Sequence, residues 1–464
     1  MSGREFGPES CHPGPVGPER AAHPAGARRA ERPRLRDLGL QVGCLPTGPL
    51  NAITDVAGVM VGHHTLYRPD AGVCTGVTAI RPHPDNPFRE KVWAAAHVIN
   101  GFGKAMGLVQ IAELGTLETP IVLTNTLSVG IAAHGLVRWM LAMDAAIGDS
   151  AGTVNPVVLE CSDAYLNDQR ALAIQPEHVL LALDNARAGS TLPPVGGATR
   201  GPDVRAQGEA SGVTPGDSDS SGGRPEEGVV GAGTGMICYG YKGGIGTASR
   251  VVAGPAGTFV VGVMVLANFG RRGELRFLGR PVAASRDAAG DVCGSAERAY
   301  GASRSPHAAP GRMRAQGRQD EGSGASRGDG SVIVVVATDA PLTSRQLGRL
   351  ARRAVVGLSR TGSHISHGSG EFVLAFSTAA RVPHQAPDEV MSIRLLPDHG
   401  ETFAGLLVAV ADATEECVYN ALLRAHTTRG FRGRVVEALP LGALHPLRGG
   451  CPTGLAEQDT EGGA

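Results

Sequence analysis

The strongest constraint on the fold is an abrupt change of composition at the tetrapeptide Gly328-Asp329-Gly330-Ser331. A long low-complexity segment ends there, and the most hydrophobic run of the chain, residues 332–337, follows at once. A short, continuous apolar run that is bounded by turn residues is typical of a buried strand. We therefore expect Ser331 to open a buried strand directly after a flexible linker.

A serine in this position is a candidate hidden N-terminus. If the chain cuts itself before Ser331, the cut releases both a hydroxyl nucleophile and a free α-amine. That amine, with an ordinary pKa of roughly 7.7–8.0, can act as the general base of its own nucleophile near neutral pH. The alternative is an ordinary boundary between linker and strand, because Gly and Ser also punctuate loops.

The composition excludes several classes of function. The 464 residues carry 43 basic and 44 acidic side chains, a formal net charge of −1, so no global field attracts polyanions. Aromatic residues make up only 4%, which argues against stacking platforms for nucleic acid. No stretch approaches the roughly 18 uninterrupted apolar residues of a membrane span. We expect no binding of nucleic acid or membrane.

The eight cysteines are scattered singly, without the spacing of a zinc site or a disulfide framework. Isolated cysteines are typical of a reducing compartment, and the N-terminus carries Arg, Pro, Gly and His in place of an apolar signal core. The sequence therefore predicts a cytoplasmic protein without a metal or other cofactor.

Ordered blocks alternate with low-complexity segments along the chain. Residues 1–36, rich in Pro, Gly, Arg and Glu, predict a disordered extension. Residues 37–330 form the first part of a single domain, with insertions at about 196–227 and 284–330. Residues 331–447 complete the same domain, and residues 448–464 form a polar tail.

The hydrophobic pattern predicts a mixed α/β architecture. Strands are expected at 57–61, 76–80, 120–123, within 250–265, at 331–337 and at 371–376. Helices are expected at 106–114 and 131–146, after a Thr343–Gln346 capping box, and from 414 to about 426, with a further apolar run at 403–410. This mixture favours layered packing of buried sheets over a single open parallel sheet.

A series of sequence blocks occurs in the order of one known family. The first blocks are GPLNAITDV at 48–56, TGVTAI at 75–80 and LTNT at 123–126. GTGM at 233–236, YKGGIGTASR at 241–250 and ANFGRR at 267–272 follow, and VATDAPL at 336–342 and GSGE at 368–371 close the series. Together they resemble the DmpA-type autoproteolytic aminopeptidases, the group of L-aminopeptidase/D-esterases and β-peptidyl aminopeptidases.

The resemblance implies an α/β (α+β) fold, a four-layer αββα sandwich of the DmpA and ornithine-acetyltransferase-like type. It implies a precursor that is cut between Gly330 and Ser331 into two chains that stay associated, with Ser331 as the nucleophile. Members act on N-terminal residues of short peptides, amides or esters and need no metal. They commonly form homotetramers, so we expect a homo-oligomer, a tetramer of processed heterodimers.

Ser369 and Glu371 have the two-residue spacing that places both side chains on one face of a strand. In the family these positions lie beside the nucleophile, where Glu371 can hold or accept a proton from the new amine and Ser369 relays a hydrogen bond. Without the resemblance, a polar strand edge with a solvated glutamate is the simpler interpretation.

Asn268 and Glu160 are the other candidates of the site. The Asn268 amide can face the oxygen that becomes negative in the tetrahedral intermediate, although a turn-forming Asn is the alternative. Glu160 resembles the acidic residue that meets the terminal ammonium of the substrate in the family. Its alternative is a structural salt bridge to an arginine.

The tyrosine that assists the oxyanion in the family has Tyr165 as its candidate, with Ser162 as the alternative at the aligned position. Two departures from the family pattern bear on substrate preference more than on the reaction. Phe102 and Lys104 stand where Asn and Glu are expected, and Leu127 stands where His is frequent.

Three rival interpretations remain. Gly243, Gly244 and Gly246 could cradle a phosphate, but they lack the spacing of a nucleotide-binding loop, and tight backbone packing explains them better. A related acyltransferase of the ornithine acetyltransferase type shares the broad architecture but cuts itself before a threonine. A processed but inactive peptide-binding protein is the third interpretation.

Overall fold

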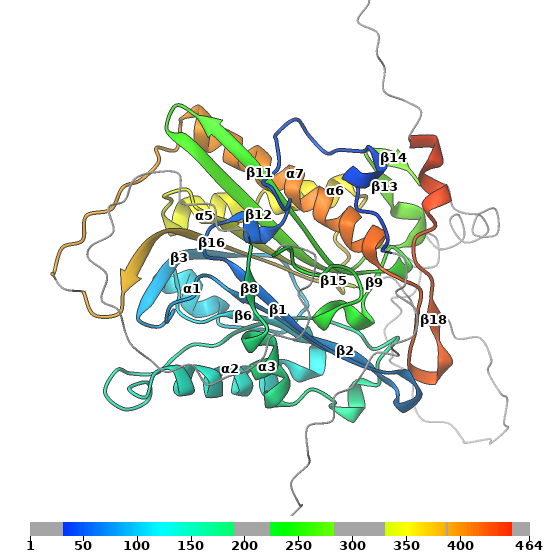
Figure 1. Cartoon of the computed structure of the whole chain (residues 1–464), viewed down its shortest axis with the longest axis horizontal. Helices are drawn as coiled ribbons and strands as arrows, with labels where there is room; N and C mark the ends of the chain where they lie inside the picture. Colours follow the sequence, from blue (N-terminus) through cyan, green and yellow to red (C-terminus); the bar gives the residue numbers. More distant parts are fainter. Residues whose placement is uncertain (1–30, 190–222, 283–329, 387, 448–464) are drawn as a thin grey trace, which may run out of the picture. The chain divides into compact units, whose positions relative to one another are not determined.

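The computed structural model describes residues 31–189, 223–282, 330–386 and 388–447 (Figure 1). Every helix and strand below belongs to the unit that begins at Arg32, and of the unit Met1–Glu31 only Glu31 is described. The expected insertions at about 196–227 and 284–330 lie outside the described residues except at their edges, and the polar tail at 448–464 lies wholly outside them.

The predicted strand at 331–337 is confirmed as β15 (Ser331–Thr338), and it lies inside a six-stranded sheet, here called sheet B. The order of sheet B is β11 (Gly244–Gly254), β12 (Gly257–Asn268), β15, β16 (Gly370–Pro383), β3 (Glu90–Gly101) and β5 (Thr116–Leu117). Strand β15 runs antiparallel to β12 and parallel to β16. The first residue of β15 is therefore held by a neighbouring strand on each side.

Both faces of β15 are buried, which explains its continuous apolar sequence. Val332, Val334 and Val336 belong to one hydrophobic core, and the alternate residues Ile333, Val335 and Ala337 belong to another. The period of two along the strand thus divides the side chains between two cores.

A second six-stranded sheet, here called sheet A, is built mostly from the first part of the chain. Its order is β4 (Ala105–Met106), β7 (Val157–Cys161), β6 (Ile121–Asn125), β2 (Val73–Arg81), β1 (Met60–Arg68) and β8 (Arg187–Ala188). The expected strand at 76–80 falls in β2, and the one at 120–123 overlaps β6, which begins at Ile121. The one expected at 57–61 only overlaps the start of β1.

Helices pack against both sheets (Figure 1). Helices α2 (Val129–Met143) and α3 (Pro176–Asp184) contact sheet A, and α5 (Ser344–Ala351) and α7 (Glu401–Arg424) contact sheet B. Helix α6 (Ala354–Arg360) packs on α7, and α1 (Leu108–Leu114) packs on β3. Three two-stranded ribbons complete the strands: β9 (Ile237–Cys238) with β10 (Tyr241–Lys242), β13 (Arg276–Phe277) with β14 (Arg280–Pro281), and β17 (Thr428–Arg429) with β18 (Val435–Val436).

Three large hydrophobic cores follow from this packing. One combines side chains of sheet B with α5, α6 and α7, and a second combines sheet A with α2 and α3. The third draws residues from both sheets, among them Leu123, Leu159, Leu266 and Ile333. The fold is a mixed α/β structure in which the sheets share a core, as the pattern of buried runs predicts.

The capping box predicted at Thr343 is confirmed. The Gln346 N–H donates to Thr343 Oγ1 at 3.3 Å, and the Thr343 N–H donates to Gln346 Oε1 at 2.9 Å. The helix that it starts is divided into α5 and α6, with Arg352 and Arg353 between them. Further on, the separate apolar run and helix expected at 403–410 and 414–426 form the single helix α7. Helix α7 is buried on most of its circumference because it packs on β11, β12 and α6.

Arg34 and Leu35 belong to the fold, although both lie within the expected extension at 1–36. Leu35 is fully buried, and the Arg34 side chain donates to the carbonyls of Asn51 and Thr247. Arg34 also pairs with Glu227 at 2.7 Å, which places the last residue of the expected insertion at 196–227 inside the fold. Composition averaged over a window cannot detect a buried ion pair of this kind.

Helix α2 lies in the one described segment, residues 126–143, that is long and apolar enough to span a membrane by length and composition. We expected no such stretch from the sequence. In the fold, Ala132, Leu136 and Met140 are buried in the core that α2 shares with sheet A and α3. An apolar face of this kind is that of a helix covering a sheet.

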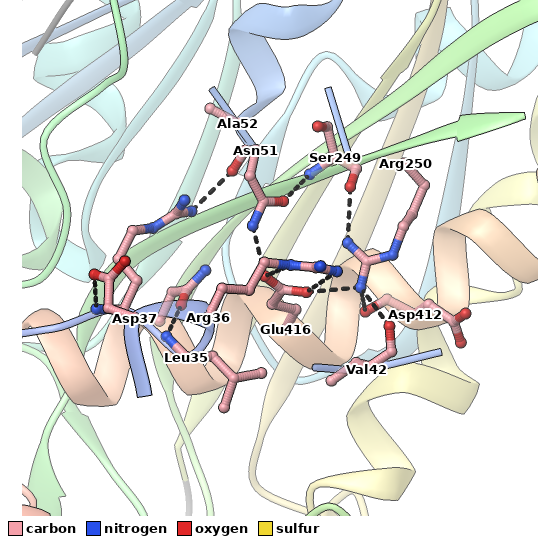
Figure 2. A network of polar contacts seen from close by, with 12 residues as sticks. Leu35, Arg36, Asp37, Val42, Asn51, Ala52, Ser249, Arg250, Asp412 and Glu416 are labelled. Carbon is pink, nitrogen blue, oxygen red and sulfur yellow. Dashed lines mark hydrogen bonds and ion pairs between the residues drawn. The ribbon is translucent and has the colours of Figure 1, made fainter. Parts of the chain in front are cut away.

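A buried ionic network joins the start of the ordered chain to α7 (Figure 2). Glu416 on α7 accepts hydrogen bonds from Arg36 and Asn51, and it pairs with Arg250 of β11 at 2.7 Å. The side chains of Glu416 and Arg250 are fully buried. Burial opposes ionisation, but Arg250 and Arg36 together hold the pKa of Glu416 below its usual value. The network thus connects residues that precede Ser331 in the sequence, namely Arg36, Asn51 and Arg250, to helix α7, which follows Ser331.

Candidate active site

Ser331 begins β15, and the two neighbouring strands bring Asn268, Ser369 and Glu371 towards it. It pairs with Asn268 at the end of β12 and with Gly370 at the start of β16. Its side chain is on the face of β15 that points towards the core shared by the two sheets, and the residue is 6% exposed. Strand pairing therefore brings Asn268, Ser331 and the Ser369–Glu371 pair to one place.

Ser369 and Glu371 form a hydrogen-bonded pair beside this position. The Ser369 hydroxyl donates to Glu371 Oε1, and both residues are buried. The solvated glutamate of the simpler interpretation is thus wrong. Burial raises the pKa of Glu371, and the hydrogen bond from Ser369 partly offsets that shift.

The second carboxylate oxygen, Glu371 Oε2, is buried and has no hydrogen-bond partner among the described residues. A buried acceptor without a donor is costly. Gly370, the neighbour of Glu371, pairs with Ser331, where cleavage would release an α-ammonium, a donor of the required charge.

The orientation of the Asn268 amide is fixed by two backbone groups. Asn268 Oδ1 accepts from the Ile237 N–H at 2.8 Å, and Nδ2 donates to the Ser162 carbonyl at 2.9 Å. Because an N–H can only donate and a carbonyl can only accept, the amide cannot be reversed. The second hydrogen on Nδ2 remains for another acceptor, such as an oxyanion at the carbon that Ser331 attacks.

Glu160 lies on β7 of sheet A and is 2% exposed. Its Oε1 accepts from the Lys104 backbone N–H at 2.9 Å, and Oε2 accepts from the Thr126 hydroxyl. No arginine pairs with it among the described residues, so the salt-bridge alternative is not supported. Glu160 is a buried carboxylate held by neutral donors, without a cationic partner in that part of the chain.

Two of the residues that depart from the family pattern, Phe102 and Leu127, are exposed apolar side chains at 61% and 53%. They adjoin the two segments that bind Glu160, since Lys104 follows Phe102 by two residues and Thr126 precedes Leu127. The Lys104 ammonium lies 5.7 Å from the centre of the Phe102 ring. Phe102 and Leu127 are therefore next to the segments that hold Glu160.

Cys161 is a site residue that sequence reasoning missed. It follows Glu160 on β7, and its side chain interacts with that of Ser331. Its thiol also lies 3.6 Å from the Leu266 carbonyl of β12. Burial, and secondarily the charge of Glu160, raise the pKa of the Cys161 thiol well above its usual value. The thiol therefore stays protonated and is a poor rival nucleophile.

Asn100 was also missed as a supporting residue. Its Nδ2 contacts the carbonyls of Ser366, His367 and Ser369, the last at 2.5 Å, and so holds the turn that precedes β16. The pairing of β3 with β16 brings it there. An Asn two residues before Phe102, in the loop that departs from the family pattern, is the signal that could have found it.

The Tyr165 ring lies under the Arg434 guanidinium at 4.9 Å and packs on a small cluster with Leu166 and Val436. Ser162, the alternative, contributes its carbonyl to Asn268, and its side chain is exposed. Ser162 therefore contacts the candidate site through its backbone carbonyl.

The glycine cluster is explained by close backbone packing, as preferred from the sequence. A Cβ at Gly244 would lie 1.9 Å from the Gly228 carbonyl oxygen, and one at Gly246 would lie 2.0 Å from the Cys417 carbonyl oxygen. No group of three or more His, Cys, Asp or Glu that could hold a metal occurs among the described residues.

Ser331 thus opens a strand between two candidate groups, the Ser369–Glu371 pair and the Asn268 amide. The chain belongs to peptidase family S58, whose model matches residues 51–436. It is 36% identical to the β-peptidyl aminopeptidase BapA of Sphingosinicella microcystinivorans over 430 residues, which is 91% of this chain and 93% of BapA. The membership makes this chain a serine aminopeptidase of the self-cleaving type and favours a peptidase over the acyltransferase.

Solved structures agree with this assignment. The PH0078 protein from Pyrococcus horikoshii OT3 is 41% identical, with a TM-score of 0.69 over 89% of this chain and 98% of that one. The L-aminopeptidase D-Ala-esterase/amidase from Ochrobactrum anthropi is 33% identical, with a TM-score of 0.69 over 90% of this chain and 98% of that one. The latter is described as a new variant of the Ntn hydrolase fold.

Proposed function

We propose that the chain cuts its own Gly330–Ser331 bond and then uses Ser331 as an N-terminal nucleophile that removes N-terminal residues from short peptides, amides or esters. The observation that carries this proposal is the position of Ser331. It begins a buried strand between Asn268 on one side and the Ser369–Glu371 pair on the other.

Self-cleavage uses the Ser331 hydroxyl and the Gly330–Ser331 peptide bond, with water as the co-reactant and Asn268 as the oxyanion donor. The Ser331 hydroxyl adds to the Gly330 carbonyl carbon, its proton passes to the Ser331 nitrogen, and the carbon–nitrogen bond breaks to leave an ester. Water then hydrolyses the ester, which frees the Gly330 carboxylate and the Ser331 α-amine. Asn268 Nδ2 stabilises the oxyanion that forms on the way.

In the processed enzyme the α-amine of Ser331 takes the proton of its own hydroxyl as Oγ attacks the substrate carbonyl. Glu371 Oε2, unpartnered in the uncut chain, holds the resulting ammonium, and Ser369 fixes the other carboxylate oxygen. The ammonium returns the proton to the leaving group. An acyl-enzyme remains, and water hydrolyses it.

Substrates carry a free N-terminal amine, and Glu160 is the residue that binds it. Glu160 is a buried carboxylate with neutral donors only, so a cationic ligand would relieve the cost of its burial. The names of the relatives include β-peptidyl and L-aminopeptidase activities. Phe102 and Leu127 lie where they would set the choice among L-, D- and β-amino acids.

Three further properties belong to the proposal. The order of layers is helix, sheet, sheet, helix, supported by one core shared between the sheets and one core between each sheet and its helices. The processed chains assemble as a homotetramer. The protein resides in the cytoplasm, as the scattered cysteines indicate.

The test is intact-mass analysis of the purified protein under denaturing conditions, followed by assays on aminoacyl p-nitroanilides. We expect two chains of about 34 and 14 kDa, apportioned from chain length, with the smaller one beginning at Ser331. Substrates with a free amine should be hydrolysed, whereas their N-acetylated forms should not. A single inactive chain of 47.6 kDa would favour the inactive peptide-binding protein instead.

Replacing Gly330 by alanine is expected to slow self-cleavage. A Cβ at Gly330 would lie 2.0 Å from the Asn268 carbonyl oxygen, so the scissile peptide must shift away from the oxyanion donor. A displacement of about 1 Å can cost roughly 10²-fold in rate. Cleavage is followed by pulse–chase in cell-free translation. Gly130→Ala, where the added Cβ meets nothing within 4 Å, is the matched control and should be cut at the wild-type rate.

Replacing Asn268 by aspartate is expected to lower kcat by about 10²–10³-fold with little change in KM, because the oxyanion loses a donor. Aspartate keeps an acceptor for the Ile237 N–H, but its second oxygen faces the Ser162 carbonyl with no hydrogen to donate, so circular dichroism and the unfolding midpoint are compared with those of the wild type. Steady-state rates on p-nitroanilides are divided by the concentration of cleaved chain. Asn185→Asp, at an exposed amide that donates to the His63 carbonyl, is the control. If Asn268→Asp and Asn185→Asp have the same kcat, Asn268 has no role in the mechanism.

A further inference from the structure

Lys242 is a buried lysine close to the candidate site to which the mechanism above gives no role. It lies at the end of β10 and is fully buried. Its ammonium group donates to three backbone carbonyls, those of Gly233 at 3.0 Å, Met236 at 2.8 Å and Gly243 at 2.9 Å. The side chain thus holds together the loop that runs from the 3-10 helix Gly231–Gly235 to β11.

This cation has no carboxylate partner among the described residues. Its titratable neighbours are two buried thiols, Cys74 on β2 and Cys238 on β9, whose pKa burial raises to about 12, so both stay uncharged near neutral pH. Burial lowers the pKa of Lys242 to about 7. Burying a lysine without a counter-ion costs folding free energy, which a purely structural role does not explain.

One of the three carbonyls connects Lys242 to the oxyanion donor. The Met236 carbonyl and the Ile237 N–H belong to the same planar peptide group and point in opposite directions. The carbonyl accepts from Lys242 Nζ at 2.8 Å and from the Gly243 N–H at 3.0 Å. The N–H donates to Asn268 Oδ1 at 2.8 Å. Lys242, this peptide and Asn268 therefore form one continuous chain of hydrogen bonds.

The hydrogen bonds that connect Lys242 to Asn268 all run in one direction. Every link donates from the lysine towards Asn268, whose remaining Nδ2 hydrogen is the last donor of the series. Hydrogen bonds in such a series polarise one another, so a positive charge at one end strengthens the donor at the other. The far end is where negative charge develops during attack by Ser331.

We propose that Lys242 is a positioning residue for the oxyanion, which fixes and polarises the Met236–Ile237 peptide and through it aims the Asn268 amide at the carbonyl under attack. The proposal rests on the function proposed above. It extends the catalytic unit beyond Asn268 to a residue that does not touch the substrate.

The test is a double-mutant cycle with Lys242→Met and Asn268→Ala, measured as kcat and KM on the processed enzyme. In the wild-type background, Lys242→Met is expected to lower kcat by about ten- to hundred-fold with KM nearly unchanged, less than the loss of the donor itself. In the Asn268→Ala background, the same change should lower kcat by less than about two-fold, because the residue acts through Asn268. Multiplicative losses in the double variant, or an unchanged kcat in the single one, would overturn the proposal.

Two further variants guard against misfolding. Lys242→Gln keeps a donor near the carbonyls but lacks the charge, and it replaces Lys242→Met in the cycle if the methionine variant does not fold. Lys91→Met removes another lysine, which lies on β3 and pairs with Glu118 at 3.4 Å. It should leave kcat unchanged even if stability falls. If the wild-type enzyme is itself inactive, the proposed function fails; if only the cycle is additive, the inference fails alone.

Discussion

Replacing Ser331 by alanine is expected to abolish self-cleavage and peptide hydrolysis together, because both reactions lose the attacking oxygen. Loss of a serine nucleophile costs on the order of 10⁶-fold in kcat. Alanine differs from serine by one atom, and the site is 6% exposed, so the fold should persist. Intact-mass analysis should show one chain of 47.6 kDa, and p-nitroanilide assays should show no turnover.

Ser331→Thr is the informative companion, since it keeps a hydroxyl and adds a methyl group in a buried position. We expect slow cleavage and weak activity, in contrast to the alanine variant. If Ser331→Ala is still cut at the same bond, the nucleophile lies elsewhere, and mass analysis of the fragments would locate the cut. Circular dichroism of the uncut variant checks that the fold is intact.

Replacing Glu416 by glutamine is expected to lower the free energy of unfolding by about 3–5 kcal/mol, since removing one partner of a buried ion pair strands the other. Here two arginines lose their partner, Arg250 with no exposure and Arg36 partly exposed. Urea unfolding should be measured in the Ser331→Ala background, where a single uncut chain unfolds. The midpoint should move to lower urea with little change in the slope.

Asp398→Asn is the matched control for that measurement. Asp398 also binds two arginines, Arg345 at 2.6 Å and Arg349 at 3.1 Å, but at the surface. Exposed ion pairs contribute little to stability, so the unfolding midpoint should hardly move. Similar shifts for the two variants would mean that burial does not govern the strength of the Glu416 network.

Local signals were sufficient for some elements of the fold and not for others. Strand β15 was predictable from its apolar run, and the start of α5 from the Thr343–Gln346 spacing, because each depends on neighbouring residues alone. Strand β3 was missed because it contains Ala94, Ala95 and Ala96, which are weak strand formers. Its conformation depends on pairing with β16, which is distant in the sequence.

The candidate site shows the same division. Ser331 could be singled out from its position after a linker, whereas Asn268, Glu160 and Glu371 gained their proposed roles only through resemblance to a family. Cys161 and Lys242 escaped notice because their importance depends on what packs against them. A cysteine between a glutamate and a serine, or a lysine before two glycines, has no distinctive local pattern.

The strand order of sheet B also determines when the chain can be cut. β15 and β16 separate β12 from β3, so the segment that precedes Ser331 contains both outer pairs of the sheet but not its two middle strands. The two products of cleavage, synthesised as separate polypeptides, would each expose unpaired strand edges and open cores. Folding must therefore precede the cut. The two chains of the enzyme are associated from the start, because they are synthesised and folded as one continuous polypeptide.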